Sequence, residues 1–80
     1  MAAAQSIIFD KSKQVVSSQI LKVEYSATSR IMQVTFTNTS KYQYNDVSLK
    51  EYETVANSSS VGASFNQTIK NYKQFRKVGN

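Results

Sequence analysis

The last twenty residues carry the strongest chemical signal in the sequence. Positions 61–80 hold four basic residues and no acid: Lys70, Lys73, Arg76 and Lys77. Lysine and arginine neutralise phosphates, and the ring of Phe75 can stack on a base. This end therefore predicts a phosphate-bearing ligand, either RNA or a nucleotide. The alternative is a solvated basic face that serves only solubility.

A second candidate site precedes this basic segment. Three serines stand before Gly62, where we expect a helix to begin: Ser58, Ser59 and Ser60. Backbone N–H groups and the positive end of a helix can receive a phosphate. The GxxxxGK[ST] phosphate loop is absent. The alternative is that a serine caps the helix and Gly62 supplies only space or a positive φ.

Three tyrosines form a third candidate surface. Tyr42 and Tyr44 share one face of a predicted strand, and Tyr25 can join them across the sheet. An exposed aromatic sheet would suit single-stranded nucleic acid. The alternative is that so short a chain needs these rings as core, with each hydroxyl at the core edge.

The composition argues against catalysis. The chain has no histidine and no cysteine, which removes the commonest general base, the commonest metal ligand and any thiol nucleophile. Its acids form no convincing pair for acid–base chemistry. We therefore expect no enzyme activity, no metal and no cofactor.

Eighty residues with a net charge of +5 indicate a single small domain. Neither a secretory signal nor a membrane-spanning run is evident, so we expect a cytoplasmic protein with no membrane partner. We expect residues 1–14, with the apolar stretch Ile7–Phe9, to be a flexible arm. Residues 15–77 would form the domain and 78–80 a tail.

The elements that must position these residues follow from hydrophobic periodicity. Alternation predicts strands at about 19–26, 31–37 and 41–45. In the first of them, Leu21, Val23 and Tyr25 would face one way and Ile20, Lys22 and Glu24 the other. Short polar turns join the strands, and Asn38 is the residue best suited to a left-handed conformation. The prediction is a three-stranded antiparallel meander.

Two helices are predicted after the strands. Ser48 and Glu51 fit a capping box, which predicts a helix at about 49–56. A second helix would span about 63–75. Its stripe of Phe65, Ile69 and Tyr72 would cover the sheet and leave Lys70, Lys73 and Lys77 exposed. The fold class is therefore α+β, with both helices on one face of the sheet.

Two spaced motifs also resemble a known family. They are Tyr42-x-Tyr44-x-x-Val47 and Ser60-x-Gly62-x-x-Phe65-Asn66-x-x-Ile69-Lys70, preceded by Val16-Ser17-Ser18, Ile20, Tyr25, Val34 and Phe36. With these residues the chain resembles the KTSC domain over about 16–72. That family is named for its occurrence at the C-terminus of some lysyl-tRNA synthetases and also occurs as short proteins in bacteria and phages. Two departures are Ser48 in place of a usual proline and a turn without glycine before Tyr42.

The resemblance implies a small sheet with packed helices and, through its link to tRNA charging, RNA contact. Carried over by position, it implies these ligand-facing residues: Ser17, Ser18, Tyr44, Ser60, Gly62, Asn66 and Lys70. The first functional hypothesis is a non-enzymatic module that binds RNA or a nucleotide through a basic C-terminal helix. The second is a phage or mobile-element protein that sequesters a nucleotide immune signal, favouring a homo-oligomer, or blocks a host protein. The third is an accessory module with no small ligand.

Overall fold

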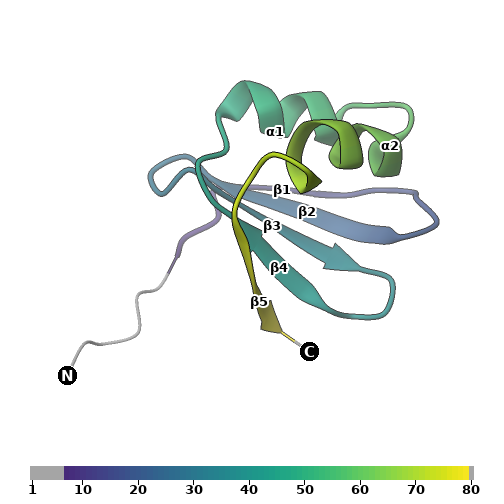
Figure 1. Ribbon diagram of the computed structural model, residues 1–80, viewed down its shortest axis with the longest axis horizontal. Coiled ribbons are helices and arrows are strands. Elements are labelled where there is room, and N and C mark those ends of the chain that lie inside the picture. The colour runs from purple at the N-terminus through teal and green to yellow at the C-terminus, as the bar shows by residue number, and fades with distance from the viewer. Residues whose placement is uncertain (1–6, 80) are drawn as a thin grey trace.

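The computed structural model describes residues 7–79, which form one sheet with two helices on one of its faces (Figure 1). The sheet is antiparallel in the order β1-β2-β3-β4-β5. The elements are β1 (Lys11–Gln14), β2 (Ile20–Ser26), β3 (Ile31–Phe36), β4 (Lys41–Tyr44), α1 (Leu49–Ala56), α2 (Val61–Phe65), a π-helical turn (Asn66–Lys70) and β5 (Phe75–Gly79). The predicted α+β class and the placement of both helices on one face are confirmed.

The prediction of three strands is wrong, because the sheet formed by residues 7–79 has five. Lys11–Gln14, expected in a flexible arm, pairs with β2 as an edge strand. Phe75–Gly79 pairs with β4 as the other edge. Residues 7–10, including Ile7–Phe9, belong to no strand, and residues 1–6 and 80 lie outside the described part of the chain. The expected tail begins within β5.

The predicted helix over 63–75 ends early. The carbonyl oxygen of Ile69 accepts hydrogen bonds from the backbone N–H groups of Tyr72 and Lys73, which closes the last turn. The chain then reverses, and the Asn45 N–H donates to the Gln74 carbonyl at 2.9 Å, next to the β4–β5 pairing. Tyr72, expected in the apolar stripe, is 74% exposed because the helix has already ended.

A bulge in β2 overturns the predicted facing of that strand. The pairing with β3 shifts register between Ile20 and Lys22. Such an extra residue reverses the alternation locally. Ile20 is therefore fully buried together with Val23, whereas Leu21 is 45% exposed.

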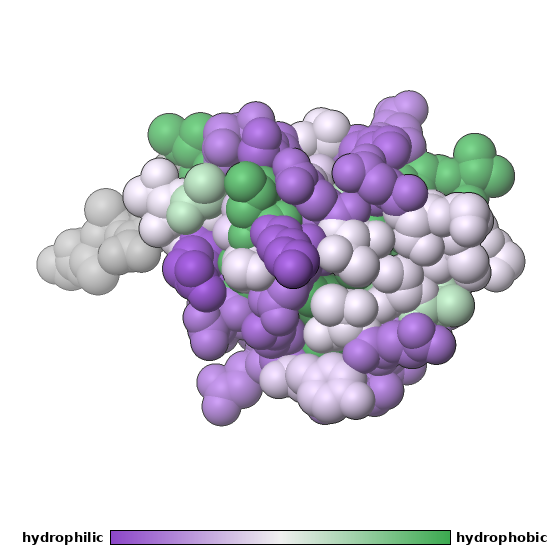
Figure 2. Space-filling model, turned by 90° about the horizontal axis from the view of Figure 1, so that it is seen from above, coloured by the Kyte–Doolittle hydropathy of each residue, from purple (hydrophilic) through white to green (hydrophobic). Residues whose placement is uncertain are grey.

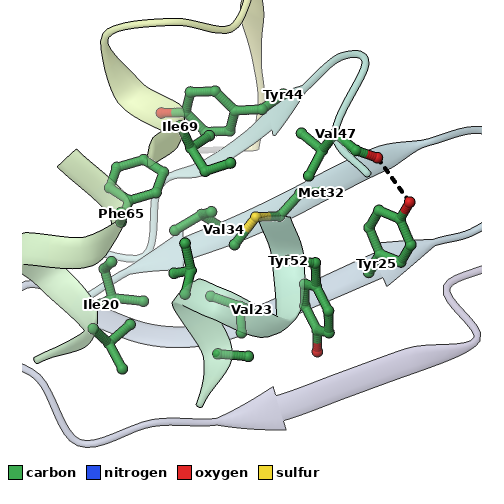
Figure 3. Close-up of a cluster of buried hydrophobic side chains, with 13 residues drawn as sticks. Ile20, Val23, Tyr25, Met32, Val34, Tyr44, Val47, Tyr52, Phe65 and Ile69 are labelled. Atoms are coloured by element: carbon green, nitrogen blue, oxygen red, sulfur yellow. Dashed lines mark hydrogen bonds between the residues drawn. The ribbon is translucent and has the colours of Figure 1, made fainter. Parts of the chain in front are cut away.

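The core lies between the helices and the covered face of the sheet. Phe65 and Ile69 point into it from α2 and the π-helical turn, towards Val34 and Tyr44 of the sheet (Figure 3). The Tyr25 hydroxyl donates to the Val47 carbonyl at 2.7 Å, which satisfies a buried polar pair. The prediction of a core role holds for Tyr25 and Tyr44, which are buried, and Tyr42 is partly buried.

Local signals placed α1 correctly and the β3–β4 turn only in part. Helix α1 spans Leu49–Ala56, and its capping box has both of its hydrogen bonds: Glu51 N–H to Ser48 Oγ and Ser48 N–H to Glu51 Oε1. In the turn, Thr39 takes the positive φ of 70°, not Asn38. The Asn38 side-chain oxygen instead accepts from the Ser40 N–H at 3.0 Å and so holds the turn.

Acid should weaken the cap of α1. The Ser48 backbone N–H, and after it the Lys73 ammonium, hold the pKa of Glu51 below its ordinary value. A lowered pKa in the folded state contributes stability above the ordinary value of about 4.3, and that stability is lost as pH falls through the folded-state pKa. We expect Glu51→Gln to flatten the fall of the melting temperature below about pH 5. Glu53→Gln, on the exposed side of the same helix, is the control, and parallel acid melting of wild type and both variants would contradict this role.

Candidate ligand pocket

A pocket of about 530 Å³ opens between the β3–β4 turn, the end of the π-helical turn and the start of β5. We call it the aromatic pocket, because four of its lining residues carry rings. The lining residues are Gln19, Phe36, Thr37, Asn38, Ser40, Tyr42, Tyr44, Lys70, Asn71 and Phe75. None of them is acidic, and Lys70 is the only one with a charge.

The rings hold one another in place. The Phe75 ring centroid lies 5.6 Å from those of both Tyr42 and Tyr44, and the Phe36 ring meets Tyr42 edge-on at 5.7 Å. Phe75 itself is 57% exposed, so one wall of the pocket remains available to a ligand. Rings fixed in this way form a stacking surface that needs little ordering on binding.

Burial decides the ionisation of the tyrosine at the inner end of the pocket. Tyr44 is only 4% exposed, and this burial raises the pKa of its phenol to about 12. At neutral pH the hydroxyl is therefore uncharged and can both donate and accept a hydrogen bond. Within residues 7–79 the Tyr44 hydroxyl has no hydrogen-bond partner, so it can form a hydrogen bond with a ligand.

The π-helical turn places Lys70 on the pocket. Ile69 is fully buried against the sheet, and Lys70, the last residue of the turn, is exposed beside Asn71. Turns of this kind are short insertions in helices and are frequent at functional sites. Among the described residues, no carboxylate pairs with Lys70, so its ammonium is available to an anion.

The predicted serine–glycine residues meet at a separate hollow of about 230 Å³. It brings together Ser17, Ser18, Ser60 and Gly62, four of the residues that the resemblance implied as ligand-facing. Gly62 has no positive φ, and its role is space: an added Cβ would lie 2.7 Å from the Gln19 side-chain nitrogen. We call this site the serine hollow. It contains no charged side chain, and the Ser60 side chain does not cap the helix.

The basic residues predicted to act together are separated. Lys73 is largely buried, with its ammonium 3.0 Å from Glu51 Oε1 and 2.8 Å from the Asp46 carbonyl oxygen that accepts its hydrogen bond. It fastens the segment before β5 to α1. Arg76 and Lys77 lie on β5, not on a helix, and are exposed. Asn66 lines neither pocket, and its carbonyl accepts from the Asn71 side chain.

Sequence reasoning found Tyr44 and Lys70 but missed most of the lining. Phe75 was proposed as a stacking ring beside the basic residues, Tyr42 as part of an aromatic surface or of the core, and Phe36 as core. Asn38 was considered only as a turn residue, and Gln19 and Asn71 were given no role in binding. Phe75 and Val78 are separated by two charged residues, so period-two alternation does not mark this segment as a strand, and no local signal would have placed Phe75 beside the tyrosines.

Comparison with known proteins agrees with this architecture. The sequence model of the KTSC domain matches residues 16–75. The chain belongs to the KTSC domain family. The crystal structure of a KTSC domain protein from Yersinia pestis is similar, with a TM-score of 0.81 and 29% identity over 86% of this chain and 97% of that one. No curated relative matches the chain.

The family match covers both sites but not the two basic residues of β5. The matched range includes both the aromatic pocket and the serine hollow, whereas Arg76 and Lys77 lie just beyond it. The resemblance found in the sequence is therefore confirmed as family membership. Of the residues described, no helix has the length and apolar character needed to cross a membrane.

Proposed function

We propose that this KTSC domain acts by binding, without catalysis, and that the aromatic pocket holds one nucleotide of an RNA or a free nucleotide. The observation that carries the proposal is the combination of Phe75, Tyr42 and Phe36 with the Lys70 ammonium, which has no ion pair within residues 7–79. Rings stack on any base, and an ammonium neutralises a phosphate. The volume is within the range usual for small-molecule sites.

The charge of the pocket indicates whether its ligand is a cation or an anion. Ring-lined pockets can also hold quaternary ammonium groups. Here the lining has a lysine and no carboxylate, and the chain carries a net charge of +5. A cation would be repelled, whereas an anion is attracted both by the lysine of the pocket and by the net positive charge of the chain. A flat aromatic part of the same ligand could stack on the rings.

Two further hypotheses concern the setting. Sequestration of a free nucleotide signal by a phage or mobile-element protein would use the same pocket, so it is the second candidate. Blocking of a host protein has less support, because the face seen from above carries hydrophilic and intermediate residues with only small separate hydrophobic patches (Figure 2). In each case we propose action in the cytoplasm.

Binding should raise the thermal stability of the folded domain. A ligand at a hundredfold excess over its Kd adds about 2.7 kcal/mol to the free energy of unfolding. A thermal-melt panel of linear and cyclic nucleotides and short RNA and DNA strands identifies which class does so. The absence of a shift with every nucleotide and oligomer would contradict the proposal.

Lys70→Ala is the variant that tests the location. We expect weaker binding and a plot of log K against log salt that is flatter by about 0.7, the slope for one phosphate contact on a single strand. Isothermal titration at several salt concentrations measures both. Lys50→Ala, an exposed lysine of α1, removes the same charge elsewhere and should leave binding almost unchanged.

A third variant separates the aromatic pocket from the serine hollow. Ser60→Ala removes a hydroxyl from the serine hollow, and Ser60 neither lines the aromatic pocket nor caps the helix through its side chain. We expect Ser60→Ala to fold and bind normally. Loss of binding in Ser60→Ala with normal binding in Lys70→Ala would instead assign the ligand to the serine hollow.

A further inference from the structure

We infer that the nucleotide in the aromatic pocket belongs to a single-stranded RNA whose backbone continues along β5. This inference rests on the proposed function and names its ligand class. It is carried by the placement around the pocket and the edge strand of three cations that have no ion pair among the described residues: Lys70, Arg76 and Lys77.

The pairing of β5 sets the path. Phe75, a wall of the pocket, lies opposite Tyr44, and Lys77 lies opposite Tyr42. Residues two apart on a strand share a face and lie about 6.6 Å apart along it. Lys77 is therefore on the same face as Phe75, one step farther along β5. An RNA strand that leaves the pocket in this direction would next reach the ammonium group of Lys77.

At the open edge of β5, basic side chains project from both faces of the sheet. This strand is last in the sheet order, so within residues 7–79 only β4 pairs with it. Alternation puts Lys77 on the face covered by the helices and Arg76 on the opposite face. Both side chains are exposed. A phosphodiester backbone along this edge lies within the field of both cations.

These cations differ from two basic residues that already have ion-pair partners, whereas Lys41 of β4 is, like them, exposed and without an ion pair among residues 7–79. Arg30 is paired with Asp46 at 3.1 Å, and Lys73 with Glu51 at 3.0 Å. In the described part of the chain, Lys70, Arg76 and Lys77 have no such partner. A free mononucleotide in the pocket would engage Lys70 and leave the charges of β5 unmatched. Successive phosphates of a strand would engage them in turn, and each contact adds counterion release.

The rim of the pocket favours RNA over DNA. The Asn71 side-chain nitrogen donates to the Asn66 carbonyl at 3.0 Å, which fixes the amide. Its oxygen has no hydrogen bond among residues 7–79 and can accept one from a 2′-hydroxyl. This group is what distinguishes RNA from DNA at a binding site.

The test compares AMP, a short oligoadenylate and the DNA strand of the same sequence on the full chain. We expect the oligoadenylate to bind more tightly than AMP and than the DNA strand. Lys77→Ala should flatten the salt dependence of oligoadenylate binding by about 0.7 and leave AMP binding unchanged. Lys50→Ala is the charge-matched control, and circular dichroism checks that each variant is folded.

The outcomes separate this inference from the proposed function. Equal affinities for AMP and oligoadenylate, or an equal effect of Lys77→Ala on both, would overturn the path along β5 while leaving the pocket as a nucleotide site. Equal binding of RNA and DNA would overturn the assignment to RNA. Binding of neither AMP nor any strand would overturn the proposed function as well.

Discussion

Phe65→Ala is expected to lower the free energy of unfolding by about 3–5 kcal/mol, the usual cost of removing a fully buried phenylalanine. Phe65 is 1% exposed and lies where α2 meets the sheet. Its ring meets Tyr44 edge-on at 5.2 Å and Phe36 at 5.8 Å. A truncated side chain would leave a cavity behind the aromatic pocket, in a small domain whose total stability is about 5–15 kcal/mol.

Urea denaturation followed by circular dichroism measures this loss. Tyr72→Ala is the control, because Tyr72 is also aromatic and lies in the same segment but is 74% exposed. We expect its effect to stay within about 0.5 kcal/mol. If the two variants lost similar stability, the packing of α2 on the sheet described here would be incorrect.

Phe75→Ala is expected to weaken binding of a nucleotide or RNA strand by about five- to 150-fold, which corresponds to the 1–3 kcal/mol of one base–aromatic stack. Phe75 offers a free ring face because it is 57% exposed while its other contacts, Tyr42 and Tyr44, hold it in place. The same exposure means that its removal costs less folding stability than the removal of Phe65.

Titration calorimetry with the ligand identified by thermal melts gives this fold-change. Val78→Ala is the matched control, since Val78 lies on the same strand, is 41% exposed and does not line the pocket. Binding that survives Phe75→Ala, or falls equally in Val78→Ala, would show that stacking on Phe75 does not hold the ligand.

The elements that the sequence predicted well are those specified by neighbouring residues. Helix α1 follows from Ser48 and Glu51, three positions apart, which satisfy each other's backbone groups. The positions of the three central strands follow from their own alternation, although the facing predicted for β2 does not hold at its start. Family membership likewise rested on motifs with fixed local spacing, and it is confirmed.

The parts that escaped prediction depend on distant contacts. Strand β5 forms because Phe75 packs on two tyrosines of β4 and because Lys73 bonds to Glu51, twenty-two positions earlier in the chain. No local pattern reports such contacts. For the same reason the sequence suggested Lys70 and Lys73 as equivalent phosphate contacts, whereas the fold leaves only Lys70 available at the pocket.

The bulge in β2 is another feature that the sequence did not predict. Ile20 and Val23 both reach the core only because one extra residue interrupts the alternation. Nothing in the residue types around Leu21 marks that interruption. The end of the sheet that carries Gln19 and the pocket could therefore not be built from periodicity alone.

The most direct test of the aromatic pocket is amide chemical-shift mapping of isotope-labelled protein during titration with oligoadenylate and with AMP. The account predicts shifts concentrated at the β3–β4 turn, Lys70, Asn71 and Phe75, extending to Arg76 and Lys77 only with the oligomer. Shifts centred on Ser17, Ser60 and Gly62, or on the sheet face away from the helices, would contradict it.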